Sequence, residues 1–60
     1  MAERLLLRVE EVADLLGIGR TRVYALIAAG HLQSVKIGGS RRVPMTAVRE
    51  YLARLLDGVA

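Results

Sequence analysis

Residues 9–29, VEEVADLLGIGRTRVYALIAA, decide how this chain folds. Apolar residues recur in the first half at the i, i+3, i+4, i+7 spacing of one helical face, at Val9, Val12, Ala13 and Leu16. This spacing predicts a helix over residues 9–16 that closes at Gly17, since glycine tolerates the left-handed conformation that ends many helices. A second apolar pattern, at Val23, Leu26 and Ile27, predicts another helix over residues 20–29 with a stop signal at Gly30.

Small residues at the contact and at the turn between the two predicted helices indicate that the helices pack closely. Ala13 lacks the bulk that would hold the second helix away, and Gly17 permits a sharp turn four residues later. Val23 and Leu26 would then lock the second helix over the first. This spacing resembles that of DNA-binding helix-turn-helix units, and the resemblance implies that the second helix lies in the major groove.

Outward-facing residues of the second helix are the candidate DNA contacts. Thr21, Arg22 and Ala25 are assigned to base edges, with Arg22 best suited because its planar fork can bond two acceptors of guanine. Arg20 is assigned to phosphate. For Tyr24 we expect the ring to pack at the edge of the core, with its hydroxyl reaching a phosphate.

Residues 33–44 read as a β-hairpin around Gly38 and Gly39. A three-residue loop that includes Ser40 would place Val35, Ile37 and Val43 on one side of the ribbon, whereas a two-residue or four-residue loop would split this apolar set. The three-residue loop is therefore the prediction. It sets Lys36 opposite Arg42.

This hairpin has two interpretations. In the first it is a wing whose Lys36, Arg41 and Arg42 grip the DNA backbone or reach into the minor groove. In the second it is a plain hairpin with long solvated side chains. The helices on its N-terminal side favour the wing.

The segments at either end complete the predicted core. The leucines at positions 5–7 form an apolar run too short to distinguish a strand from an extended arm, although one of them should dock on the core. A last helix is predicted over residues 46–56, capped by Thr46. Its expected buried stripe is Val48, Tyr51, Leu52 and Leu55, and Leu56 should be exposed.

Composition bounds the class of protein. Sixty residues make one small domain, residues 1–60, and 53% of them are hydrophobic. The sequence contains no cysteine, which excludes disulfides and thiolate metal sites, and no apolar stretch long enough to cross a membrane. We expect a cytoplasmic protein with no metal site, no cofactor and no small-molecule ligand.

Charge is unevenly distributed along the chain. Residues 18–43 carry five basic and no acidic residues, whereas the flanks carry four basic and six acidic residues. A polyanion bound to one face would relieve the repulsion within the middle segment. The alternative is an ordinary solvated basic surface.

The order of motifs as a whole resembles the excisionase family, which is related to the DNA-binding part of MerR-type regulators. The resemblance rests on LLRVEEVADLLG, TRVYALI, GHL, VKIGGSRRVP and AVREYL, in that order. It implies a winged helix-turn-helix, mostly α with a small β-hairpin, in the order α-α-β-β-α. Family members usually have Thr or Ser at the position of Arg8 and Ser at the position of Gly19, so both helices start here with weaker caps.

The resemblance implies sequence-specific binding of double-stranded DNA. Excisionases bind attachment-site DNA cooperatively, bend it and direct an integrase, so self-association on adjacent sites and a recombinase partner are expected. The alternatives are a small MerR-like transcription regulator, a plasmid-transfer regulator, or an interaction module for an acidic protein. No residues stand at catalytic spacing, so we do not expect an enzyme.

Overall fold

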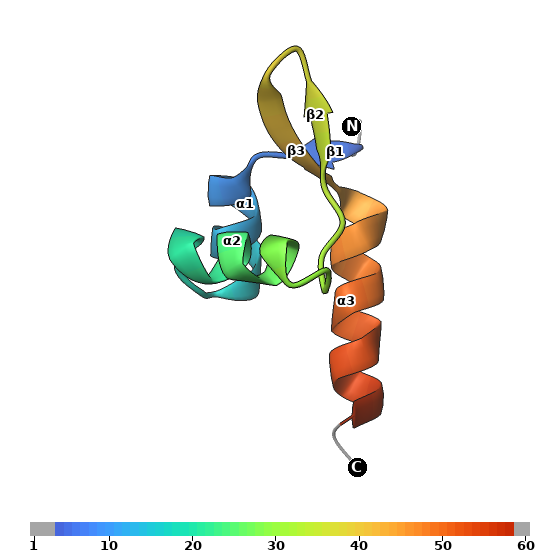
Figure 1. The fold of residues 1–60 in the computed structure, drawn as a ribbon. Coiled ribbons are helices and arrows are strands. Elements are labelled where there is room, and N and C mark those ends of the chain that lie inside the picture. Colours follow the sequence, from blue (N-terminus) through green and yellow to red (C-terminus); the bar gives the residue numbers. More distant parts are fainter. Residues whose placement is uncertain (1–3, 59–60) are drawn as a thin grey trace.

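The computed structural model describes residues 4–58 and contains helices and a small antiparallel sheet (Figure 1). Its elements are β1 (Leu6–Leu7), α1 (Val9–Leu16), α2 (Arg20–Ala28), β2 (Val35–Ile37), β3 (Ser40–Pro44) and α3 (Met45–Gly58). The predicted order α-α-β-β-α is confirmed, with one short strand added before it. The first helix has the predicted bounds, and the second ends one residue earlier than predicted.

The helix pair packs as the apolar spacing requires, with α2 crossing in front of α1 (Figure 1). Val12 of α1 and Val23 of α2 are both fully buried. Leu26 and Ile27 are partly buried against the same core. The core of this small fold consists of Leu7, Val9, Val12, Ala13, Val23, Leu32, Val43, Ala47 and Val48.

Glycines close both of these helices. At the end of α1, Gly17 adopts a left-handed conformation with φ of 69°, and the Ile18 N–H donates to the Ala13 carbonyl oxygen at 3.0 Å. At the end of α2, Gly30 has φ of 82°, and the His31 N–H donates to the Leu26 carbonyl oxygen at 2.9 Å. The chain then turns back, which brings Leu32 into the core.

Helix α1 begins without a side-chain cap, as the arginine at its N-cap predicts. Arginine carries only donors, so the Arg8 side chain cannot accept a bond from the first turn. The Glu11 side chain instead reaches back, and its Oε1 accepts the Arg8 backbone N–H at 2.9 Å. Half of a capping box therefore holds this end of the helix.

The predicted hairpin register is wrong by one residue. Val35 pairs with Arg42, Lys36 with Arg41 and Ile37 with Ser40, so the loop contains only Gly38 and Gly39. These glycines have φ of 55° and 86°, the left-handed values that a tight two-residue turn needs at both central positions. Two consecutive glycines make this turn accessible, and its twist matches that of the strands, so turn geometry overrides the apolar pattern.

A third strand supports the base of the hairpin. β1 pairs with β3 in an antiparallel register that sets Leu6 opposite Pro44 and Leu7 opposite Val43. The sheet order is β1-β3-β2, and the Met45 N–H donates to the Leu5 carbonyl oxygen at 2.9 Å. Leu6 and Leu7 of the leucine run therefore form a strand, and Leu7 is the leucine that docks on the core.

Helix α3 starts one residue before the predicted start and continues through Gly58. Of the predicted stripe, Val48 is buried and Tyr51 is partly buried, but Leu52 and Leu55 are each 46% exposed. This part of the prediction is wrong because the last turns of α3 extend beyond the other elements, which leaves nothing to cover them (Figure 1). Leu56 is exposed, as predicted.

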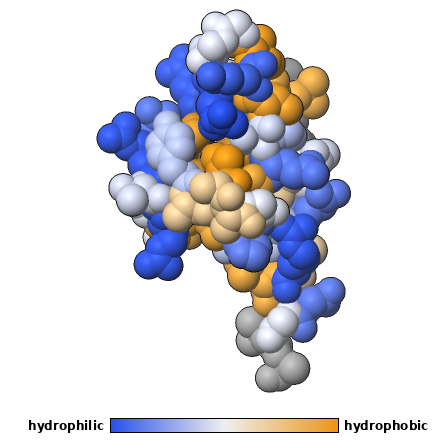
Figure 2. Space-filling view, in the orientation of Figure 1, coloured by the Kyte–Doolittle hydropathy of each residue, from blue (hydrophilic) through white to orange (hydrophobic). Residues whose placement is uncertain are grey.

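Hydrophobic side chains reach the surface on the hairpin and on the C-terminal half of α3 (Figure 2), and also at Leu5, Leu15 and Tyr24. Val35 and Ile37 account for those on the hairpin. Within residues 4–58, every helix is too short or too polar to cross a lipid bilayer.

Candidate nucleic-acid interface

The exposed side of α2 carries the residues predicted to meet base edges. Val23 points into the core, and Thr21 and Ala25 lie about half a turn away from it in a helix of 3.6 residues per turn. Both are exposed, as is Arg22. Thr21 and Ala25 therefore form the solvent-facing side of α2, and the exposed Arg22 lies on one of the two flanks beside it.

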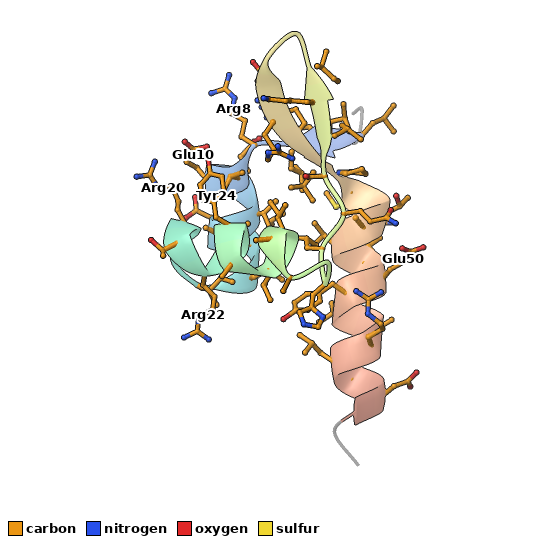
Figure 3. The ribbon with its side chains drawn as sticks, in the orientation of Figure 1. Arg8, Glu10, Arg20, Arg22, Tyr24 and Glu50 are labelled. Atoms are coloured by element: carbon orange, nitrogen blue, oxygen red, sulfur yellow. The ribbon has the colours of Figure 1, made fainter. Side chains whose placement is uncertain are left out.

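The two flanks of α2 differ in what they face. Arg20 and Tyr24 project from the flank nearer the hairpin, whereas Arg22 projects from the opposite flank (Figure 3). Arg22 is thus separated from Arg20 across the width of the helix. The structure keeps all three side chains solvent-accessible.

The prediction that the Tyr24 ring packs at the edge of the core is wrong. It is 51% exposed, because Val23, Leu26 and Ile27 supply the side of α2 that packs against the core. The ring lies on the flank beside Arg20 (Figure 3). Its hydroxyl therefore belongs to the solvent-facing surface.

Arg20 has a counterion in the free protein. Its Nη1 lies 3.6 Å from Oε2 of Glu10, on the first turn of α1. Both side chains are more than half exposed, at 65% and 61%. A pair this exposed contributes little to folding, so its carboxylate is easily exchanged for another anion.

The hairpin places its cations on both faces rather than on one. Residues directly opposite in an antiparallel pair share a face, so Lys36 and Arg41 project together and Arg42 projects from the other side. The predicted pairing of Lys36 with Arg42 is wrong, for the reason given above for the register. Val35 and Ile37 share the face of Arg42 and are 40% and 55% exposed.

Hydrogen bonds donated by the hairpin arginines restrain the base of the hairpin. The Arg41 Nη1 donates to the Ser34 Oγ at 2.6 Å, and the Arg42 Nη1 donates to the Arg41 carbonyl oxygen at 2.9 Å. Lys36 and Arg41 are exposed, and Arg42 is partly buried. Each arginine retains further N–H donors beyond the one used here.

The Glu11 carboxylate is held at the N-terminal end of α1. The pKa of Glu11 is lowered, first by the hydrogen bond from the Arg8 backbone N–H and then by the charge of Arg4. Partial desolvation opposes this shift but does not outweigh it. Arg4 forms an ion pair with the same carboxylate.

A small polar hollow lies where the end of α2 meets α3. It has a volume of about 150 Å³ and is lined by Gly30, His31, Gln33, Ala47, Glu50 and Arg54. Arg54 donates to the His31 carbonyl oxygen and lies over the Tyr51 ring, 5.9 Å from its centroid. Residues 4–58 contain no group of three or more His, Cys, Asp or Glu side chains arranged to hold a metal ion.

Arg8 is a residue that the sequence reasoning treated only as a poor helix cap. Its exposed side chain lies on the same flank as Glu10 and Arg20, between α2 and the hairpin (Figure 3). The available signal was its charge at a position where the resembling family usually has Thr or Ser. The tertiary fold was needed to bring it beside α2.

The fold and this surface define a winged helix-turn-helix protein. The chain matches the helix-turn-helix domain family over residues 6–55. It is 54% identical over 56 residues to a probable excisionase of Saccharopolyspora erythraea, covering 93% of this chain and 57% of that protein. It is 51% identical over 47 residues to an excisionase of Streptomyces ambofaciens, covering 78% of this chain and 76% of that protein.

This chain belongs to the excisionase family of helix-turn-helix proteins. It spans a little over half the length of its Saccharopolyspora relative.

Proposed function

We propose that this chain binds double-stranded DNA sequence-specifically and acts as a recombination directionality factor. The observation that carries the proposal is a solvent-facing α2 beside a cation-bearing hairpin, in a chain similar to two proteins named as excisionases. Removing the cationic side chains of either α2 or the hairpin should then weaken binding to DNA.

Each exposed element receives a role in this proposal. Thr21, Arg22 and Ala25 read base edges in the major groove, because Thr21 and Ala25 form the solvent-facing side of α2 and Arg22 is exposed on the adjoining flank. Arg20 and Tyr24 hold phosphates on the flank nearer the hairpin. The wing contributes Lys36, Arg41 and Arg42.

Cations on both faces of the wing suit a groove with two phosphate walls. Lys36 and Arg41 would meet one sugar-phosphate strand, and Arg42 would meet the other. The narrow turn at Gly38 and Gly39 would enter between them. The corrected register therefore supports a wing that enters the minor groove better than one that lies on a single strand.

A domain of this size buries a limited area of DNA, so one copy should bind weakly. We therefore propose self-association on adjacent sites, where each neighbour raises the effective concentration of the next. A recombinase bound to the same DNA is the second proposed partner. The role is architectural, and it requires no bond to be made or broken by this chain.

Footprinting on DNA that flanks the native gene tests the proposal most directly. Protected repeats at a recombination attachment site are expected. Protection confined to a promoter would overturn the directionality role and favour a transcription regulator or a plasmid-transfer regulator. A measured affinity for duplex DNA that does not rise as salt is lowered would overturn DNA binding and favour an acidic protein partner.

A further inference from the structure

A carboxylate lies next to Arg20 on the flank of α2 nearer the hairpin. Figure 3 shows Glu10 on the side of the molecule that also carries Arg8, Arg20 and Tyr24. The Glu10 Oε2 lies 3.6 Å from the Arg20 Nη1. A carboxylate in this position is the intramolecular equivalent of a bound anionic oxygen.

The backbone of Arg8 is held firmly although its side chain is exposed. Its N–H donates to Glu11 Oε1 at 2.9 Å, and its carbonyl oxygen accepts the Val12 N–H at 3.0 Å. The residue is extended, with φ of −74° and ψ of 157°, as an N-cap should be. The guanidinium therefore extends from a fixed point at the junction of β1 and α1.

Arg8 stabilises the start of α1 less than a residue that can cap the helix would. Replacing a capping Ser, Thr, Asp or Asn by a residue that cannot cap costs about 1 kcal/mol. What Arg8 offers instead is a positive charge on the same flank as Arg20 and Tyr24. A cation at the N-cap of α1, in place of a capping residue, is explained if an anion binds beside Arg8.

We propose that Arg8 and Arg20 bind a backbone phosphate of duplex DNA between α2 and the wing, displacing Glu10, which pairs with Arg20 in the free protein. The inference rests on the proposed DNA-binding function and adds a site to it. A phosphodiester accepts hydrogen bonds from both guanidinium groups, and the exposed Glu10 pair is weak enough to yield. The Tyr24 hydroxyl lies on the same flank and can donate to the next phosphate.

Arg8→Thr is the informative substitution, because stability and DNA binding should change in opposite directions. Threonine can cap α1, so the melting temperature should rise. Affinity for duplex DNA should fall roughly two- to fivefold, the range of one exposed ion pair. The slope of log K against log salt should become shallower by about 0.9, the value for one lost phosphate contact.

Three further variants make the test specific. Arg8→Lys keeps the charge and should keep the salt slope. Arg49→Thr removes an exposed arginine from α3, about half a turn from the buried Ala47, and should leave the slope unchanged. Glu10→Gln removes the competing carboxylate and should raise affinity about twofold.

The outcomes separate this inference from the function on which it rests. If the wild-type chain binds DNA with a salt-dependent affinity and Arg8→Thr binds with the same affinity and slope, the phosphate site is overturned and DNA binding stands. If the wild-type chain shows no salt-dependent binding to duplex DNA, both are overturned. A lower affinity for Arg8→Thr that is matched by Arg49→Thr would also overturn the site, because net charge alone would account for it.

Discussion

Lys36 pairs with Arg41 across the hairpin, so two cationic side chains leave the same face of the ribbon at directly opposite positions. Like charges placed this way destabilise a strand pair by about 0.2–1 kcal/mol. The hairpin accepts this cost on its exposed half, where solvent screens the charges. A polyanion would turn the same arrangement into a favourable one.

Replacing Lys36 by Thr should therefore stabilise the free protein and weaken DNA binding. We expect the free energy of unfolding to rise by about 0.2–1 kcal/mol, because the opposing charge of Arg41 is relieved. Affinity should fall by a similar factor for all DNA sequences, and the salt slope should drop by about one. Chemical denaturation and a salt titration of binding measure the two effects. Lys36→Arg, as the control, should change neither.

Arg22 should control base preference rather than general affinity. Arg22→Ala should cost about 1–3 kcal/mol at the preferred site, because a bidentate bond to a base edge is lost. Binding to an unrelated duplex should change much less. Competition between the two duplexes measures the ratio, and Arg20→Ala is the matched control expected to weaken both equally. An unchanged ratio in Arg22→Ala would contradict the assignment.

The hairpin register predicts unequal effects for two valines that an alternative register would treat alike. Val43→Ala should destabilise the fold by about 2 kcal/mol, because Val43 is fully buried opposite Leu7. Val35→Ala should cost less than about 0.5 kcal/mol, because Val35 is already 40% exposed. If thermal or chemical denaturation showed equal losses of stability for Val43→Ala and Val35→Ala, the three-residue loop would be supported instead.

Gly19 and Gly39 should respond in opposite ways to serine. Gly19 is the N-cap of α2 with φ of −79°, and a Cβ there meets no atom within 4 Å. Gly19→Ser should therefore stabilise the fold by about 0.3 kcal/mol. Gly39 has φ of 86°, so Gly39→Ser should destabilise by about 1 kcal/mol. Denaturation curves of the two variants test both turns at once.

Stability should decline in acid partly through Glu11. Its folded pKa lies below the unfolded value of 4.5, so its contribution is present above that pH and is lost as pH falls through the folded pKa. Glu11→Gln should lower the melting temperature at neutral pH, and the difference from wild type should shrink in acid. Melting curves between about pH 3 and pH 7 measure this, with Glu50→Gln as a control outside the α1 cap.

Local chemistry was enough to locate most elements. The bounds of α1 follow from its apolar spacing and from Gly17, and those of α2 follow from Val23, Leu26 and the stop at Gly30. The hairpin was also located, because Gly38 and Gly39 interrupt two short β-rich runs. The outward positions of Thr21, Arg22 and Ala25 follow from helical periodicity once Val23 is buried.

Three features lay beyond that reasoning. The hairpin register follows from the geometry of a glycine turn and from the pairing of Val43 with Leu7, and a count of apolar residues on one face does not contain either constraint. The exposure of Leu52 and Leu55 depends on where the neighbouring elements end, so periodicity alone predicted a buried stripe. The placement of Arg8 beside α2 depends on how the chain enters α1.

The amino-acid sequence by itself therefore determined the helix pair, the presence of a wing and the segregation of positive charge into residues 18–43. Tertiary structure decided which face of the wing each cation occupies, how much of α3 is covered, and that Arg8 and Arg20 share one flank with Glu10. The physical reason is that helix periodicity and glycine stops act over a few residues. Strand register, burial and charge clustering depend on segments that meet only after the chain has folded.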